Sequence, residues 1–184
     1  MVVYIHGFGS SAQGTKSVIL KELFQEQGFI APSLSYVPDL AIETLKDMIS
    51  SYLKYENVYL VGSSLGGYYA TYLANYFEIP AVLINPAVNA ATTLSQAIGY
   101  AHNYYDNSTF EWNESHIKML EKLNVLEIKD ELYMLLAQTE DEVLNYKEAV
   151  DKFQNSQMFV EVGGNHSFEG IERHKENIER FFQL

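Results

Sequence analysis

The amino-acid sequence predicts an α/β protein: one six-stranded, mostly parallel sheet flanked by helices, with a helical cap inserted between two strands. Three observations predict this class. Short apolar runs recur along the chain, segments with helical periodicity separate them, and 184 residues suffice for one domain with a two-sided core. We therefore expect a single domain over residues 1–184, with the cap formed by residues 86–130.

The expected strands are short apolar runs without strict alternation of polar and apolar positions. Such runs are typical of strands that helices cover on both faces, as in a parallel sheet. They are Val2–Ile5, Val58–Val61, Ala81–Ile84, Leu132–Leu136 and Met158–Val162. A sixth run, Ile30–Leu34, contains Pro32, and because proline cannot donate a ladder hydrogen bond, we expect this strand at a sheet edge.

Between the strands, apolar residues recur at the spacing of one helical face. The segments with this period are Val18–Phe24, Leu40–Leu53, Tyr68–Phe77, Tyr146–Phe153 and Ile171–Phe182. Strands that alternate with helices in this way form right-handed crossovers, which place helices on both faces of one sheet.

The stretch from Pro86 to Asp130 is the exception, because it is far longer than the roughly dozen residues that a crossover needs. Part of it has a helical period and much of it is aromatic. The helical period is formed by His116, Ile117, Leu120 and Leu123. The aromatic residues are Tyr100, Tyr104, Tyr105, Phe110 and Trp112. We interpret this stretch as the cap.

The composition excludes several classes of function. Acidic residues outnumber basic ones 24 to 12, and the net charge of −12 repels nucleic-acid phosphates and anionic lipid head groups, so neither is an expected partner. The chain has no cysteine, which excludes disulfides and thiolate metal sites and is compatible with a cytoplasmic location. No apolar run approaches the roughly 20 residues of a membrane span.

The segment Gly62-Ser63-Ser64-Leu65-Gly66 has the pattern Gly-x-Ser-x-Gly, between a buried-strand run and a helical run. That context is the one in which a nucleophile elbow forms. The tight turn holds the serine at a strained backbone angle and excludes side chains at the flanking positions, and the helix that follows favours an anionic intermediate. We predict Ser64 as a nucleophile, whereas Ser63 is expected to be a structural hydroxyl.

A serine nucleophile needs a base, which we expect from a histidine on a loop at the same sheet edge. His166 lies in Gly163-Gly164-Asn165-His166-Ser167, between the last strand and the last helix. This is where the base stands in the chain order Ser, Asp, His. The other histidines fit less well, because His102 and His116 belong to the cap and His174 lies within the last helix.

The carboxylate that orients the base is expected after the strand Leu132–Leu136, where the chain has three consecutive acids. We predict Asp141, because a short side chain on a tight turn holds an imidazole at a fixed distance. Glu140 is the main alternative. Asp130 and Glu131 stand at the other end of the strand and therefore at the wrong edge of the sheet.

The loop after the first strand is the expected source of an oxyanion donor. We predict the backbone N–H groups of Phe8 and Leu65 as the pair, with His6 in a structural role. The same loop reads Gly7-x-Gly9-x-x-Ala12, a form of the dinucleotide fingerprint, but no acid ends the second strand to bind a ribose. A nicotinamide-binding enzyme is therefore a weaker alternative. No histidine pair has metal-ligand spacing, so no metal or cofactor is expected.

These segments together resemble the small bacterial YqiA-like esterases of the α/β-hydrolase superfamily, over essentially the whole chain. The matching segments are Tyr4–Phe8, Val61–Thr71, Asn85–Val88, Asp141–Leu144 and Gly163–His166. The resemblance implies hydrolysis of carboxylic esters, with acyl-thioesters such as acyl-CoA as a second substrate class, through Ser64, Asp141 and His166. It also implies a sheet that lacks the first two strands of the full fold. Two departures are Glu140, where the family usually has glycine, and Asn145, where it usually has an acid.

The expected ligand is thus a small acyl ester or thioester, cleaved through an acyl-enzyme. Four tyrosines are candidate substrate-binding residues: Tyr36, Tyr68, Tyr104 and Tyr105. One alternative is a binding module on the same fold, in which Glu140 has disturbed the acid and no turnover survives. Another keeps the three residues and changes the reaction to amide or lactone opening or peracid formation, since the fold does not fix the substrate.

Overall fold

The computed structural model describes residues 1–184 and is built around a six-stranded sheet in which every neighbouring pair of strands is parallel. The strand order is β2-β1-β3-β4-β7-β8. The strands are β1 (Val2–Ile5), β2 (Phe29–Ile30), β3 (Tyr59–Ser64), β4 (Ala81–Pro86), β7 (Tyr133–Gln138) and β8 (Gln157–Glu161). The predicted α/β class and the six-stranded sheet are therefore confirmed.

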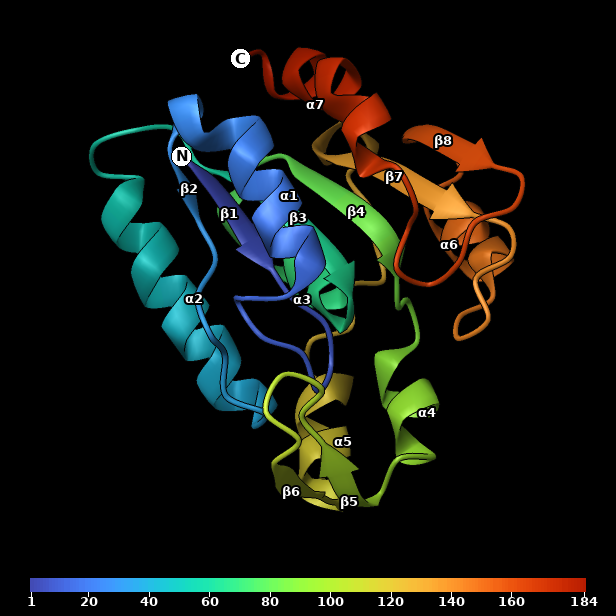
Figure 1. Ribbon diagram of the computed structural model, residues 1–184. Coiled ribbons are helices and arrows are strands. Elements are labelled where there is room, and N and C mark those ends of the chain that lie inside the picture. The colour runs from blue at the N-terminus through green and yellow to red at the C-terminus, as the bar shows by residue number, and fades with distance from the viewer.

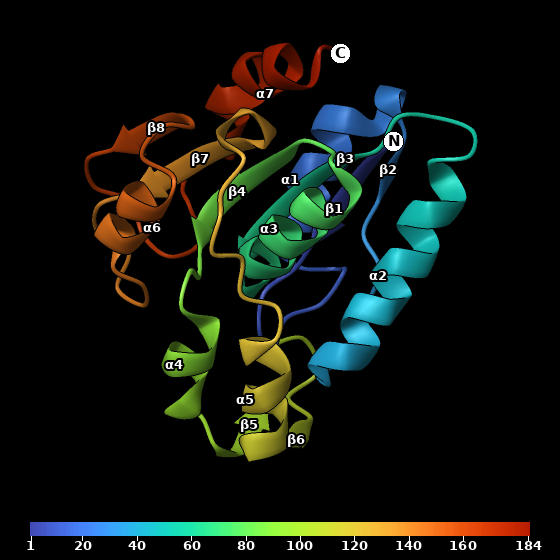
Figure 2. The same ribbon diagram turned by 180° about the vertical axis from the view of Figure 1, so that it is seen from behind.

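Helices cover both faces of this sheet (Figures 1 and 2). On one face lie α1 (Thr15–Phe24) and α7 (Lys175–Phe182), and on the other lie α2 (Pro38–Tyr52), α3 (Leu65–Phe77) and α6 (Tyr146–Lys152). Three short 3-10 turns complete the layers: η1 (Gln25–Gln27), η2 (Asp130–Leu132) and η3 (Ile171–His174). None of these helices has both the length and the apolar character needed to cross a bilayer.

The two faces of the sheet bury separate apolar cores, and successive residues of a strand alternate between them. In β4, Ala81 and Leu83 pack in the core beneath α2, α3 and α6, whereas Val82 and Ile84 pack in the core beneath α1 and α7. All four side chains are fully buried. This explains the uninterrupted apolar runs in the sequence, because no position of a central strand faces water.

The edge strand β2 is shorter than predicted, since only Phe29 and Ile30 pair with β1. Pro32, which has no N–H to donate, lies just beyond the paired residues. The chain then continues along the sheet edge without ladder bonds to reach Tyr36 and α2.

The insertion between β4 and β7 is helical only in part. It contains α4 (Ala90–Ser95) and α5 (Glu114–Glu121), and between them an antiparallel pair, β5 (Gly99–His102) and β6 (Thr109–Trp112), which the sequence reading did not anticipate. The insertion lies beyond the carboxyl ends of the sheet strands, at the end of the molecule away from both termini (Figure 1).

Buried hydrogen bonds hold the insertion together and attach it to the rest of the domain. The indole N–H of Trp112, which is fully buried, donates to the carbonyl oxygen of Leu94 at 3.0 Å. The hydroxyl of Tyr68 on α3 donates to the carbonyl oxygen of Leu120 on α5 at 2.8 Å. The insertion is thus packed on the sheet domain and forms a wall above the strand ends.

Candidate active site

Ser64 occupies a sharp turn between β3 and α3 and has a φ of 56° and a ψ of −123°, a combination that a side-chain-bearing residue rarely adopts. The flanking glycines make the turn possible. A Cβ atom at Gly66 would overlap the carbonyl oxygen of Ile5, and one at Gly62 would overlap the backbone of Gly66. Ser64 therefore stands at the first turn of α3, as a nucleophile elbow requires.

The ring of His166 connects Ser64 to Asp141. Its Nε2 lies 3.0 Å from Ser64 Oγ, and its Nδ1 lies 2.9 Å from both carboxylate oxygens of Asp141. These three residues come from the ends of three strands, β3, β7 and β8, which the parallel sheet brings to one edge. In this arrangement Nδ1–H donates to the carboxylate, so Nε2 is free to accept the serine proton.

Asp141 is anchored independently of the histidine. Its side chain is 2% exposed, and Oδ1 accepts hydrogen bonds from the backbone N–H groups of Val143 at 2.9 Å and Leu144 at 2.8 Å. Burial by itself raises the pKa of this carboxyl, but the hydrogen bonds from His166, Leu144 and Val143 outweigh it and hold the pKa below its usual range. The carboxylate is therefore ionised at neutral pH.

Glu140, the alternative acid, makes no side-chain hydrogen bond to His166. Its side chain is exposed, and its backbone N–H donates to the carbonyl oxygen of Gly163 at 3.1 Å. The neighbouring Glu142 instead contacts the base loop, because its Oε2 accepts a hydrogen bond from the His166 backbone N–H at 2.9 Å. Of the three consecutive acids, only Asp141 reaches the imidazole ring.

Two buried amides that the sequence reading did not single out hold the loop of His166. Asn85, the second-to-last residue of β4, has a φ of 39°. It donates from Nδ2 to the carbonyl oxygens of Asn165 and His166, and its Oδ1 accepts from Gln138 N–H at 2.9 Å. Gln138 Oε1 in turn accepts from the N–H groups of Asn165 and Glu169. The sequence signal for Asn85 is its place at the end of an apolar strand, immediately before Pro86.

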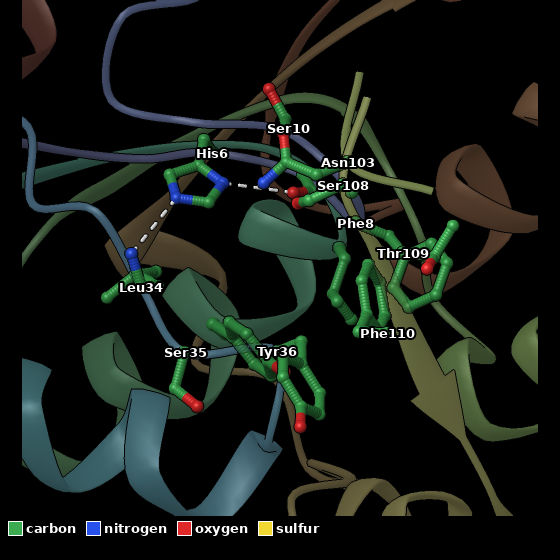
Figure 3. A pocket seen from close by; sticks show the side chains of 14 residues that line it. His6, Phe8, Ser10, Leu34, Ser35, Tyr36, Asn103, Ser108, Thr109 and Phe110 are labelled. Atoms are coloured by element: carbon green, nitrogen blue, oxygen red, sulfur yellow. Dashed lines mark hydrogen bonds between the residues drawn. The ribbon is translucent and has the colours of Figure 1, made fainter. Parts of the chain in front are cut away.

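His6 supports the loop after β1, as predicted. Its Nε2 accepts from Leu34 N–H at 3.2 Å, and its Nδ1 lies 3.0 Å from Gly7 O (Figure 3). Burial lowers the pKa of this histidine, so the neutral ring with its proton on Nδ1 satisfies both contacts. His6 thus ties the loop of Phe8 to the chain that follows β2.

The two predicted oxyanion donors flank the elbow. Leu65 is the first residue of α3, so its N–H has no helical acceptor, and the N–H of Phe8 makes no hydrogen bond within the chain. The loop of Phe8 lies against Ser64, since a Cβ atom at Gly7 would be 3.1 Å from Ser64 Cβ. Both N–H groups are therefore available beside the serine.

Two cavities meet at this loop. The Phe8 cavity has a volume of about 190 Å³ and a mixed lining. Its aromatic and apolar side includes Phe8, Tyr36, Leu65, Tyr69 and Phe110, and its polar side includes Ser10, Ser35, Asn103, Ser108 and Thr109 (Figure 3). The rings of Tyr36 and Phe110 stack there, with centroids 4.7 Å apart. The Lys16 cavity is larger, about 580 Å³, and its lining includes Tyr4, Lys16, Ser64, Tyr104, His166 and Glu169.

The four tyrosines predicted as substrate-binding residues take different positions. Tyr36 lines the Phe8 cavity and Tyr104 lines the Lys16 cavity. Tyr68 is 3% exposed and lines neither, because its ring packs in the core and its hydroxyl bonds to Leu120. Tyr105 is exposed on the turn between β5 and β6 and also lines neither cavity. No group of three or more acidic or histidine side chains is arranged to hold a metal ion.

The parallel sheet, the elbow after β3 and the insertion after β4 define the protein as an α/β-hydrolase in fold. More particularly, the chain belongs to the family described as uncharacterised protein family UPF0227, the YqiA family, which it matches over residues 1–183. The predicted family resemblance is thereby confirmed.

Solved structures of other proteins share this fold. Alpha/beta hydrolase domain-containing protein 10 from mouse is 19% identical, with a TM-score of 0.77 over 99% of this chain and 89% of that chain. Est1E from Butyrivibrio proteoclasticus, solved with ferulic acid bound, is 14% identical, with a TM-score of 0.77 over 99% and 87%. A monoacylglycerol lipase from Paleococcus ferrophilus is 17% identical, with a TM-score of 0.71 over 99% and 93%.

Proposed function

We propose that this protein is a serine hydrolase that cleaves carboxylic esters through an acyl-enzyme, with Ser64 as nucleophile, His166 as base and Asp141 as the orienting acid. The observation that carries the proposal is the continuous hydrogen-bonded chain from Ser64 Oγ through His166 to Asp141, at 3.0 and 2.9 Å. Solved proteins of the same fold include esterases and a lipase, which agrees with this reaction class.

In the proposed reaction, His166 Nε2 takes the Ser64 proton as Oγ attacks the acyl carbon. The negative charge that develops on the carbonyl oxygen is stabilised by the N–H groups of Phe8 and Leu65, and each such donor typically contributes about 2.7–4 kcal/mol. The His166 imidazolium, held by ionised Asp141, then protonates the leaving alcohol. Water repeats the sequence on the acyl-enzyme and releases the acid.

The Phe8 cavity suits the acyl group, because it borders both proposed oxyanion donors and aromatic rings form part of its lining. An apolar cavity of about 150 Å³ in another protein accommodates a benzene molecule. The 190 Å³ of the Phe8 cavity therefore fits an acyl chain of about six carbons or one aromatic ring. We infer a preference for short acyl chains.

Hydrolysis of p-nitrophenyl butyrate by the purified protein and by Ser64→Ala tests the proposal. We expect turnover by the parent and loss of nearly all of it in the variant. A fluorophosphonate probe gives a second readout, because only an activated serine reacts with it. A parent protein that neither turns over the ester nor takes up the probe would be a binding module on a hydrolase fold, and the proposal would be wrong.

A matched panel of butyryl esters, butyryl thioesters and butyryl amides then defines the bond that is cleaved. The same three residues serve all three chemistries, so the expected order follows from the leaving groups, with the amide slowest. Within the esters, activity is expected to fall once the acyl chain exceeds the capacity of the Phe8 cavity. A steady rise in activity up to twelve-carbon chains would contradict the assignment of that cavity.

A further inference from the structure

The leaving alcohol of the proposed reaction must lie beside His166, because that residue gives it a proton. His166 lines the Lys16 cavity and does not line the Phe8 cavity. If the acyl group occupies the Phe8 cavity, which shares Gly7, Phe8 and Ser10 with the Lys16 cavity, the alcohol portion of the ester extends into the Lys16 cavity. This assignment rests on the proposed function.

Lys16, in the first turn of α1, places its ammonium group in this cavity. Nζ donates to Ser63 Oγ at 3.0 Å, and Ser63 directly precedes the nucleophile in the chain. An ammonium group has three donors, and this is its single hydrogen bond within the protein. Two donors of Lys16 are therefore free to bind a ligand next to Ser64.

Lys16 also lacks an ion-pair partner, although acids outnumber bases 24 to 12 in this chain. Glu169 lines the same cavity, yet no carboxylate oxygen lies within 4.0 Å of the Lys16 ammonium. The carboxylate of Glu169 instead accepts a hydrogen bond from Asn165 Nδ2. A partly buried, unpaired cation is costly to keep, which indicates that the cavity is built for an anion.

We propose that Lys16 binds a carboxylate on the alcohol portion of the ester and so selects substrates with an anionic leaving group. A single ammonium matches a single negative charge, and the protein's own excess of acids makes a local cation necessary for such recognition. Because Ser63 adjoins Ser64, the bound carboxylate lies near the ester bond. Lys16 is in this view a specificity-determining residue.

The charge state of the lysine is compatible with this role. Burial lowers the pKa of Lys16 to about 8, an effect that the nearby Asp141 carboxylate partly opposes. The side chain is thus still mainly charged at pH 7. The other titratable groups lining the cavity are Tyr4, His166 and Glu169. Burial raises the pKa of Tyr4 to about 12, so it stays neutral.

The test compares two leaving groups of nearly the same shape, in 4-carboxyphenyl butyrate and the neutral 4-carbamoylphenyl butyrate. The measured quantity is the ratio of kcat/KM for the acid to kcat/KM for the amide. We expect Lys16→Met to reduce this ratio by about 10-fold or more, since it removes a charge-assisted hydrogen bond. Lys16→Arg, which keeps the charge, is expected to retain part of the preference.

Lys21→Met is the matched control, because Lys21 lies on the same helix outside the Lys16 cavity and its loss changes the net charge equally. It should leave the ratio unchanged. Ser63→Ala separates recognition from structure, since it removes the partner of Lys16 but keeps the cation. If Lys16 only supported Ser63, Ser63→Ala would reproduce the effect of Lys16→Met, and the proposal would be overturned.

A binding measurement separates this inference from the proposed function. In Ser64→Ala, which carries out no chemistry, 4-hydroxybenzoate should bind more tightly than 4-hydroxybenzamide, and the additional change Lys16→Met should remove the difference. Equal binding of the two phenols, or an unchanged kcat/KM ratio in Lys16→Met, overturns the role of Lys16 while leaving ester hydrolysis intact. A protein without esterase activity that still prefers the benzoate would support the anion site and refute the proposed reaction.

Discussion

Asn85 donates a hydrogen bond from its side-chain amide to the backbone carbonyl oxygen of His166 at 3.2 Å, across 81 positions of the chain. The same amide nitrogen also donates to Asn165 O at 2.9 Å. The end of β4 therefore fixes the backbone of the proposed base, without touching its imidazole.

This contact predicts that Asn85→Ala lowers kcat by about 10-fold while changing KM little, because the variant displaces the base and leaves intact the Phe8 cavity, which His166 does not line. Buried hydrogen-bond partners left unpaired cost about 1–3 kcal/mol, so the thermal midpoint should also fall. Steady-state kinetics and thermal unfolding measure the two effects. Asn89→Ala is the control, since Asn89 is an exposed amide bonded to Glu148 and should leave both quantities near the parent values. A rise in KM with unchanged kcat would show that Asn85 shapes the cavities instead.

Three isosteric substitutions distinguish the roles of the three consecutive acids that follow β7. Asp141→Asn should lower kcat by about 10⁴-fold, the loss that the equivalent change produces in serine proteases, because the amide stabilises the wrong imidazole tautomer. Glu140→Gln should leave kcat within about 2-fold, as its carboxylate does not reach the ring. Glu142→Gln keeps an acceptor for His166 N–H and should have a small effect. A large loss in Glu140→Gln alone would reassign the acid.

The dependence of the unfolding free energy on acidic pH should reveal the contribution of ionised Asp141. The pKa of Asp141 is lower in the folded protein than in the unfolded chain, where an aspartate titrates at about 3.9. The ionised carboxylate therefore stabilises the fold above that pH. The contribution is lost as the pH falls through the folded-state pKa. We expect the difference in unfolding free energy between the parent and Asp141→Asn to be constant from pH 7 to 5 and to shrink below about pH 4. Urea unfolding at each pH measures it, and a difference that grows towards acid would contradict the shift.

Lys16, although proposed to bind substrate, should destabilise the folded protein at neutral pH. Its pKa is lowered from 10.5 to about 8, so between these values the unfolded state binds more protons and stability rises with pH. Below about pH 8 the cost of the buried charge is fully present. Lys16→Met should therefore stabilise the protein at pH 7 by about 1–2 kcal/mol, after allowing for the lost bond to Ser63. The gain should disappear by about pH 10.5, and Lys21→Met should show none.

Most of the sheet was predictable, because strands that are buried on both faces appear in the sequence as short uninterrupted apolar runs. The expected bounds of Val2–Ile5 agree with the structure, and those of the other central strands differ by up to three residues at their ends. The hairpin of β5 and β6 was not predictable in the same way. Three of the four residues in Gly99–His102 are exposed, so the segment shows no apolar face. In the structure its Gly99 pairs with the fully buried Trp112 of β6.

The three residues of the proposed site were placed from motifs whose geometry the backbone dictates, namely a glycine-flanked serine and histidine and acid loops at strand ends. The groups that position them were missed. Asn85, Gln138 and Lys16 act through contacts between distant segments. Apart from the place of Asn85 at the end of an apolar run, nothing in the local sequence distinguishes these residues from exposed amides and lysines. The tyrosines show the same limit of local reasoning, since Tyr68 proved to be a core residue whereas Tyr36 and Tyr104 line cavities.

The separation of Ser64 and His166 by 102 positions has a consequence for biosynthesis. A nascent chain on the ribosome exposes the serine early, but the base docks only after β8 and the loop behind it have emerged. Under the proposed mechanism, translation products truncated before His166 would therefore carry an unactivated hydroxyl at Ser64. In the proposed mechanism, a chain interrupted before His166 has no base for Ser64 and is therefore expected not to react with acyl groups.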